Sequence, residues 1–373
     1  MKVLQSCLSM SWGGMEMYTL LTSQILKKAG CEVAILCFKD SRIHFESVRS
    51  DIPVYVIEKN PVSIVSSIFK FRKLFRNFDI IHSQASKDLW LLVPALSFSN
   101  VRTPLVFTKH IGSNIVKKDL FHRVLYKRVN LAIAISKVIQ KNLVETTPLT
   151  PDKIVLLYDS IDTEKFDPIK YNKLQIRKEF GISPDELIVG MTGRISPGKG
   201  HEEFLYSAKD LVKKHKNLKF MIVGGSSPDE INYENKIKSL VKKFGLKDNV
   251  IFTGFRSDVP KLLACFDIFV FPSHAEAFGL ALVEAMSMGL PSVCTSSDGV
   301  LDIALDHYTS YLFGRENYFT LKEKVEELIE HPSLRRQFGQ NARRHVVDNF
   351  SLSDFVNKLL LLYEAQLKES VKF

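Results

Sequence analysis

Two glutamates that could bind hydroxyl groups, Glu276 and Glu284, stand either side of a glycine that opens a helix. Glu276 and Phe278 come directly before Gly279, and an apolar, Ala-rich helix is expected over about Leu280–Met288, ended by a glycine and a proline. The free N–H groups at the start of such a helix attract phosphate. A carboxylate on each side of that phosphate would accept hydrogen bonds from sugar or ribose hydroxyls. The segment therefore predicts a site for a nucleotide sugar.

The string E-x-F-G-x-x-x-x-E-A-M with a trailing G-x-P resembles the donor-site motif of the retaining, family-4-type glycosyltransferases, also called glycosyl transferases group 1. The resemblance implies the GT-B architecture, in which two Rossmann-like domains face each other across a donor cleft. It also implies that Phe278, Gly279, Leu280 and Glu284 contact the donor and that Glu276 is catalytic. The alternative interpretation is that Glu276 is an ordinary loop acid and Glu284 a solvated helix residue.

A second loop carries cations that suit a leaving diphosphate. Residues 193–200 read G-R-I-S-P-G-K-G, which is similar to the G-R-x-x-x-x-K-G pattern of the same family. Negative charge grows on a nucleoside diphosphate as its bond to the sugar breaks, and Arg194 and Lys199 would stabilise that charge. Arginine can do so with two parallel hydrogen bonds. The loop is not a P-loop, because G-x-x-x-x-G-K-[ST] is absent; a charged surface loop is the alternative.

Three further positions gain a role from the resemblance. Gly13 and Gly14 follow the first strand, where two glycines let backbone approach a phosphate, although such a pair alone often marks a simple turn. His110 follows the strand expected at 105–108; family members often place a histidine here, which implies a hold on a sugar hydroxyl or on developing charge. A lone histidine is otherwise structural. Gly254 ends a strand of the second half, where glycine would let a base or ribose approach.

Length and pattern predict the organisation of the chain. A chain of 373 residues suits two domains, and apolar runs that alternate with helical patterns predict βαβ units with parallel sheets. We expect an acceptor-side Rossmann-like domain over 1–165, a nucleotide-sugar domain over 166–350, and a helix over 351–373 that returns to the first domain. The polar stretch 162–184 is expected to link the halves. The expected strands are 2–5, 32–37, 54–57, 80–82, 105–108, 131–134, 154–157, 187–192, 219–223, 249–252, 268–271 and 291–294.

The net charge of +10 comes from one region. Residues 51–141 hold 15 Lys and Arg against 5 Asp and Glu, and the rest of the chain balances. Such a patch usually faces an anion. Basic segments with aromatic residues at 64–78 and 117–128 are candidates for peripheral contact with an anionic membrane. The alternative is that the stripe of Ile64, Ile68, Phe71 and Phe75 packs on the sheet beside Lys70, Arg72, Lys73 and Arg76. No nucleic-acid-binding module is recognisable.

The remaining features narrow the class of protein. Five cysteines without metal spacing indicate buried thiols in a reducing compartment, and no run is long enough to cross a bilayer. We therefore expect a cytoplasmic protein, or one at the cytoplasmic face of the membrane. The prediction is a metal-independent hexosyltransferase without a cofactor, active in polysaccharide or lipopolysaccharide assembly on a glycan or lipid-linked acceptor. A sugar-nucleotide epimerase of the same shape, or an inactive nucleotide-sugar binder at the membrane surface, is the alternative.

Overall fold

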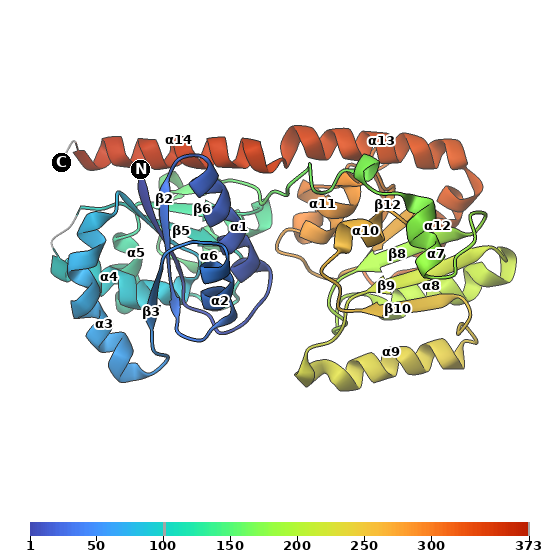
Figure 1. The fold of residues 1–373 in the computed structure, drawn as a ribbon, viewed down its shortest axis with the longest axis horizontal. Coiled ribbons are helices and arrows are strands. Elements are labelled where there is room, and N and C mark those ends of the chain that lie inside the picture. Colours follow the sequence, from blue (N-terminus) through green and yellow to red (C-terminus); the bar gives the residue numbers. More distant parts are fainter. Residues whose placement is uncertain (100–101, 372–373) are drawn as a thin grey trace. The chain divides into compact units, whose positions relative to one another are not determined.

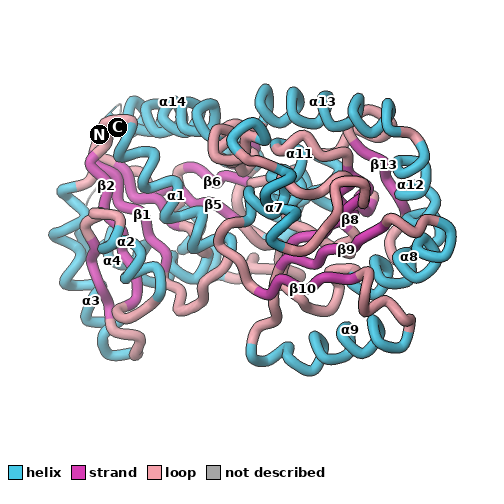
Figure 2. Tube along the Cα trace, turned by 45° about the vertical axis from the view of Figure 1, so that its right-hand side comes forward, coloured by secondary structure: helices cyan, strands magenta, loops and turns pink. Residues whose placement is uncertain are grey.

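The computed structural model describes residues 1–99 and 102–371, which divide into two compact units (Figure 1). The first unit takes Met1–Tyr158 together with Ser353–Phe373, and the second takes Asp159–Leu352. In Figures 1 and 2, helices cover both faces of a parallel sheet in each unit. The expected α/β fold with two Rossmann-like domains is confirmed.

The sheet of the first unit has the order β3-β2-β1-β4-β5-β6-β7 in the described residues, and all its pairings are parallel. Its inner strands are almost fully buried, as expected for a parallel sheet covered on both faces, and the two edge strands are partly exposed. The strands are β1 (Lys2–Cys7), β2 (Glu32–Phe38), β3 (Val54–Ile57), β4 (Ile80–Ser83), β5 (Leu105–Lys109), β6 (Leu131–Ala134) and β7 (Ile154–Leu156).

The helices of the first unit begin where the sequence supplies a cap. Asn60 and Ser136 each accept a hydrogen bond from the backbone of the helix that follows, and Pro61 occupies the first helical position of α3. The helices are α1 (Gly14–Lys28), α2 (Arg42–Arg49), α3 (Pro61–Leu74), α4 (Leu89–Ser99), α5 (Leu120–Lys127), α6 (Lys137–Thr146) and α14 (Leu352–Val371).

The second unit repeats the architecture with the strand order β10-β9-β8-β11-β12-β13 in its described residues. Its core gathers Val189, Phe204, Phe220 and Val270 from strands and helix, all at most 1% exposed. The strands are β8 (Leu187–Thr192), β9 (Leu218–Val223), β10 (Val250–Gly254), β11 (Ile268–Phe271), β12 (Ser292–Thr295) and β13 (Ser310–Phe313). The helices are α7 (Lys173–Glu179), α8 (His201–Lys214), α9 (Ile231–Lys243), α10 (Val259–Leu263), α11 (Leu280–Ser287), α12 (Tyr318–Glu330) and α13 (Pro332–Asn349).

All expected strands are present, and β13 is an additional one that the sequence pattern did not indicate. The stretch 162–184, expected as a linker, instead belongs to the second unit. Arg177 of α7 is buried, and its guanidinium binds the Asp267 carboxylate at 2.5 Å and the Cys265 carbonyl at 3.0 Å. A buried, paired arginine fixes the segment to the sheet, which polar composition alone does not reveal.

Helix α14 lies along the first unit, as expected for the returning helix (Figure 1). Leu359 and Tyr363 are fully buried, and the Tyr363 hydroxyl lies 2.6 Å from Nδ1 of His82 in β4. All five cysteines are buried and free, as expected. Among the described residues, no helix is both long enough and apolar enough to cross a membrane.

Candidate functional site

Two loops of the second unit leave neighbouring strands at the carboxyl edge of its sheet. After β8 the chain first adds β9 and β10 on one side, and later returns to place β11 on the other side of β8. The carboxyl ends of the strands at such a reversal of strand order are where open α/β sheets bind ligands. Residues 193–200 follow β8 and residues 272–279 follow β11, so the two motifs found in the sequence meet at this point.

The first loop depends on a glycine that touches the second loop. Gly200 has φ +75°, and a Cβ there would lie 2.2 Å from the carbonyl oxygen of Pro272. The backbone N–H of His274 donates to the carbonyl of Gly198 at 2.8 Å. A side chain at position 200 would force these segments apart, so the glycine allows the two loops to pack directly.

Lys199 and Glu276 form an ion pair where the loops meet. Lys199 Nζ lies 2.6 Å from Glu276 Oε1, and the two side chains keep 31% and 17% of their surface exposed. The sequence indicated separate contacts of each residue with a donor, and it did not reveal that they bind each other. The pair leaves one carboxylate oxygen of Glu276 and two N–H groups of Lys199 for other partners.

Arg194 stands on the same loop with a weaker attachment. Its side chain is 60% exposed, and Nε lies 3.5 Å from a carboxylate oxygen of Glu230. An exposed pair of this kind contributes about 0–1 kcal/mol. The guanidinium can therefore exchange Glu230 for a diphosphate at little cost.

The motif around Gly279 is held in place by contacts with Phe350 and Gly299. The Phe278 side chain is 2% exposed and packs edge-on against Phe350, with ring centroids 5.7 Å apart. The Gly299 N–H donates to the carbonyl of Glu276 at 3.0 Å, and a Cβ at Gly299 would lie 2.6 Å from the carbonyl of Ala277. Phe278 thus holds the loop as a core residue, and a donor could reach it only through its backbone.

Helix α11 begins at this loop and carries the second glutamate. Gly279 has φ +123° and caps the helix. The N–H groups of Leu280 and Ala281 have no partner within the helix, whereas the Leu282 N–H donates to the Gly279 carbonyl at 2.9 Å. Glu284 lies one turn further on and is half-buried. Burial raises the pKa of its carboxyl to about 7, and Lys165 opposes that shift. A carboxyl without strong local partners is suited to receive hydroxyl donors from a ligand.

Gly254 lies at the next strand end of the same edge. Its carbonyl accepts a hydrogen bond from Gly224 at 3.1 Å, and a Cβ at Gly224 would lie 1.8 Å from the carbonyl of Gly193. Three strand ends therefore approach one another through glycines. Arg256, a weaker candidate for the same edge, binds both carboxylate oxygens of Asp258 at 2.7 and 2.6 Å.

In the first unit, the glycine pair opens α1 as expected. Gly13 is the N-cap, and its N–H donates to Oε2 of Glu16 at 2.9 Å. Glu16 is buried, so this capping bond fixes the loop rather than serving only the helix end. Gly14 has no neighbour within 4 Å of its would-be Cβ, so backbone there is open to a ligand.

His110 belongs to a chain of buried hydrogen bonds. Its Nε2 lies 2.8 Å from Gln84 Oε1, Gln84 Nε2 donates to Gln5 Oε1 at 2.7 Å, and Gln5 Nε2 lies 3.5 Å from the Tyr363 hydroxyl. Because the Gln84 oxygen only accepts, Nε2 of His110 carries the proton. Burial lowers the pKa of His110 to about 4, so the ring is neutral near pH 7.

The sequence did not reveal the partners of His110. Gln84 directly follows the buried strand β4, a position that could have marked it, whereas nothing local in α14 indicates that Tyr363 reaches the sheet. Tyr363 also lies 2.6 Å from His82 Nδ1, and His82 Nε2 lies 2.7 Å from Thr108 Oγ1. Polar residues at the ends of β1, β4 and β5 are thereby connected to α14.

One group in the described residues has the spacing of a metal site, and it lies away from these loops. His215, Glu326 and Glu330 offer ligand atoms within 4.8 Å of one another. Lys214 Nζ already lies 3.1 Å from Glu326 and 2.8 Å from Glu330. A lysine ammonium occupies the position that a cation would take.

The family described as glycosyl transferases group 1 matches residues 172–345, and glycosyltransferase family 4 matches residues 12–165. The chain belongs to the group 1 glycosyltransferases. The family 4 match falls on the N-terminal half of the chain, and the group 1 match falls on the second unit. The group 1 match contains both the loop 193–200 and the glutamate motif that begins at Glu276.

Individual relatives of this glycosyltransferase chain are distant. The capsular polysaccharide biosynthesis glycosyltransferase CapM of Staphylococcus aureus is 30% identical over 64% of this chain and 62% of its own. The UDP-Gal:alpha-D-GlcNAc-diphosphoundecaprenol alpha-1,3-galactosyltransferase of Escherichia coli is 23% identical over 94% and 93%. This chain spans less than two thirds of the length of CapM and of several other relatives.

Solved structures share the fold of this glycosyltransferase. Anabaena HepE in complex with UDP has a TM-score of 0.86, with 22% identity over 98% of this chain and 100% of the HepE chain. Agreement of this extent at such low identity establishes the GT-B fold.

Proposed function

We propose that the protein transfers a sugar from a nucleoside diphosphate sugar to a glycan or lipid-linked acceptor in polysaccharide or lipopolysaccharide assembly. The observation that carries this proposal is the Lys199–Glu276 pair, which joins the loop that carries Arg194 to the loop that leads into α11. Cations and free N–H groups there suit a diphosphate, and two glutamates suit hydroxyls. The relatives that make capsule and undecaprenol-linked glycans support the choice of acceptor class.

The proposal includes retention at the anomeric carbon without a metal ion. Retaining glycosidases use two carboxyl groups about 5–5.5 Å apart, one of them a free nucleophile. Glu276 is instead held by the Lys199 ammonium, which favours a role in binding the sugar. A front-face displacement fits this arrangement: the bond between the anomeric carbon and the diphosphate breaks, the acceptor oxygen bonds to that carbon, and the diphosphate takes the acceptor proton. His110, neutral and oriented by Gln84, would hold a sugar hydroxyl, and Gly13 and Gly14 would approach the donor phosphates.

Single substitutions test the donor site. We expect Arg194→Ala, Lys199→Ala and Glu276→Ala each to lower turnover at least tenfold, since each removes a group that stabilises the leaving diphosphate or the sugar. Lys216→Ala, which removes an exposed cation outside the site, should leave turnover unchanged. The assay follows transfer and hydrolysis over a panel of nucleotide sugars that begins with UDP-glucose, which HepE binds, and circular dichroism checks folding. Near-normal rates in the three variants would refute the assignment, and donor isomerisation without transfer would favour an epimerase.

We also propose that α3 contacts an anionic membrane. The aromatic stripe of this helix packs inward, with Phe71 and Phe75 buried, as the alternative interpretation held. A different face of the helix, formed by Val62, Val65 and Phe69, is exposed and supports membrane contact. Replacement of Lys70, Arg72, Lys73 and Arg76 by glutamine should sharply reduce sedimentation with anionic vesicles, and unchanged binding would reject the contact.

A further inference from the structure

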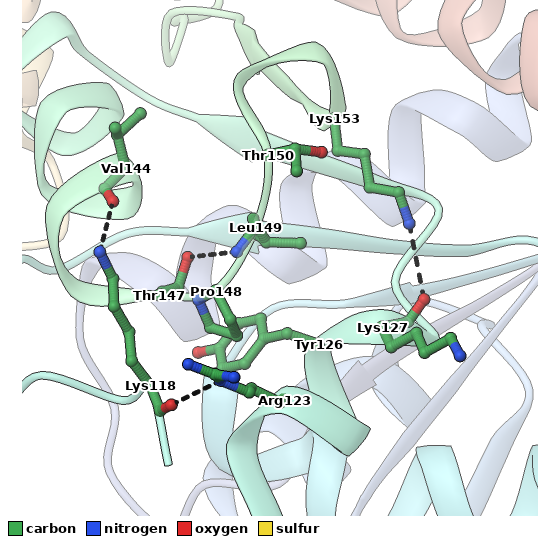
Figure 3. Close-up of a pocket in the computed structure, with 10 residues that line it drawn as sticks. All are labelled: Lys118, Arg123, Tyr126, Lys127, Val144, Thr147, Pro148, Leu149, Thr150 and Lys153. Atoms are coloured by element: carbon green, nitrogen blue, oxygen red, sulfur yellow. Dashed lines mark hydrogen bonds between the residues drawn. The ribbon is translucent and has the colours of Figure 1, made fainter. Parts of the chain in front are cut away.

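A basic pocket of about 520 Å³ lies in the first unit, and none of its lining residues belongs to the loops described above (Figure 3). Its walls come from the end of α5, the end of α6 and the segment that leads into β7. Lys127 precedes β6 and Lys153 directly precedes β7, so this part of the pocket lies at the amino edge of the sheet. Gln84 and His110 instead follow the carboxyl ends of their strands. The pocket therefore shares no residue with the candidate donor site.

The lining of this pocket is one-sided in charge. Four of its ten lining residues are cations and none is an acid; the lining consists of Lys118, Arg123, Tyr126, Lys127, Val144, Thr147, Pro148, Leu149, Thr150 and Lys153. In the described part of the chain, no carboxylate lies within salt-bridge distance of any of the four. Other surface lysines of the unit do pair, as Lys27 does with Asp51 at 2.8 Å. Uncompensated like charges in one concave site attract a counter-ion.

Backbone carbonyls hold three of these cations in place without neutralising them. Arg123 Nε donates to the Lys118 carbonyl at 2.9 Å, and Lys118 Nζ donates to the Val144 carbonyl at 3.3 Å (Figure 3). Lys153 Nζ lies 3.5 Å from the Lys127 carbonyl, which Figure 3 also shows, and it donates to the Val129 carbonyl at 2.9 Å. The two terminal nitrogens of Arg123 remain free for a bidentate contact, which matches phosphate geometry. The pocket is thus prepared for an anion with several oxygens.

Apolar side chains on the same helix indicate what the anion is attached to. Leu120, Phe121 and Val124 of α5 are 77%, 73% and 67% exposed. Leu120 and Val124 each stand three residues before one of the pocket cations Arg123 and Lys127, so they are neighbours on the helix surface. Exposed apolar residues beside a cationic site suit a molecule with a phosphate head and hydrocarbon chains.

We propose that this pocket binds the phosphate of an anionic lipid, whose chains lie against Leu120, Phe121 and Val124. The site binds lipid independently of sugar transfer, and it is distinct from α3, which carries its own basic residues. It would fix the first unit at a membrane surface through a defined headgroup contact rather than through diffuse charge alone.

A charge-matched pair of double variants tests the proposal on the full chain. Arg123→Gln with Lys127→Gln removes two pocket cations, and Lys28→Gln with Lys59→Gln removes two exposed cations of the same unit outside the pocket. Binding to vesicles of phosphatidylglycerol and phosphatidylcholine should weaken about tenfold or more in the pocket variant, since each cation near the surface contributes about 1 kcal/mol. The control variant should change much less. Calorimetry with inorganic pyrophosphate provides the second arm, and thermal unfolding checks that both variants fold.

Each combination of vesicle and pyrophosphate binding either supports or overturns the proposed lipid-phosphate site. Selective loss of vesicle binding in the pocket variant supports a lipid phosphate. Unchanged vesicle binding with selective loss of pyrophosphate binding overturns the lipid assignment. Equal behaviour of the two double variants in both arms overturns the site itself. None of these readouts depends on turnover, so failure here and failure of the transferase proposal are distinguishable.

Discussion

At the scale of single residues, the two glutamates of the donor motif differ in how their charge is held. Glu276 is compensated by Lys199 at 2.6 Å, whereas Glu284 has only the distant influence of Lys165 against its burial. Glu276 is therefore held in an ion pair, and Glu284 is a group whose protonation state changes close to neutral pH. Identical residue types in one motif thus take different roles because of their surroundings.

This difference predicts a pH dependence of donor binding. The pKa of Glu284 is raised to about 7, so its carboxylate, the form that accepts hydroxyl donors, dominates above pH 7 and is lost as the pH falls through 7. Affinity for the donor should therefore decrease by up to about tenfold per pH unit below 7. Titration calorimetry of the wild-type protein with the donor from pH 5.5 to 8.5 should show this slope. Glu284→Gln should bind the donor more weakly at high pH, and its affinity should lack the decrease below pH 7.

A second carboxyl with a raised pKa, that of Asp88, is the alternative cause of such a pH dependence. Asp88 of the first unit is fully buried, and burial raises its pKa to about 7 as well, while bonds from the Leu8 N–H and the Ser6 hydroxyl oppose the shift. A slope that persists in Glu284→Gln would contradict the role of Glu284 and would point to Asp88. His110 does not compete, because its pKa of about 4 keeps it neutral across the range.

At the scale of helices and strands, buried parallel strands were predictable and long-range polar contacts were not. Strands such as β6 and β11 are short apolar runs, and local pattern suffices to find them. The cation and glutamate loops were found because glycines and charges recur at fixed spacing. Their direct pairing through Lys199 and Glu276 depends on β8 and β11 being neighbours in the sheet, which no local pattern states.

Helices α3 and α7 also show that local sequence pattern does not reveal long-range contacts. Periodicity identified a stripe on α3 that packs inward, but whether the exposed Val62, Val65 and Phe69 face water or a partner depends on what surrounds the unit. Helix α7 lies in a polar stretch and reads as a linker. It belongs to the second unit, where Lys173 and Arg177 of this helix both bind the Asp267 carboxylate. A few long-range polar contacts can outweigh the composition of a whole segment.

At the scale of the whole molecule, the first unit is completed by the last segment of the chain. Residues 1–158 lack the returning helix α14, which contributes Leu359 and Tyr363 to the core of that unit. Tyr363 also links His82 and Gln5, and Gln5 leads through Gln84 to His110. The end of the chain therefore supports a candidate catalytic residue that lies far away in sequence.

Substitution of Tyr363 should destabilise the first unit selectively. The two tryptophans of the chain, Trp12 and Trp90, both lie in this unit, so tryptophan emission reports its unfolding. Tyr363→Ala should lower the stability of the unit by about 3–5 kcal/mol and its midpoint by about 10 °C. Tyr363→Phe keeps the ring but leaves His82 Nδ1 buried without its partner, at a cost of about 1–3 kcal/mol.

The same helix supplies the control. Leu361 is 64% exposed on α14, so Leu361→Ala should leave the tryptophan-detected midpoint unchanged. Amide exchange of β8 and β9 in the second unit should stay at wild-type protection in all variants, because neither strand belongs to the unit that α14 completes. If Tyr363→Ala and Leu361→Ala shifted the midpoint equally, α14 would be acting through its helical surface in general. The order of effects expected here, Ala greater than Phe at 363 and none at 361, instead requires the buried ring and its hydroxyl to connect the end of the chain to β4.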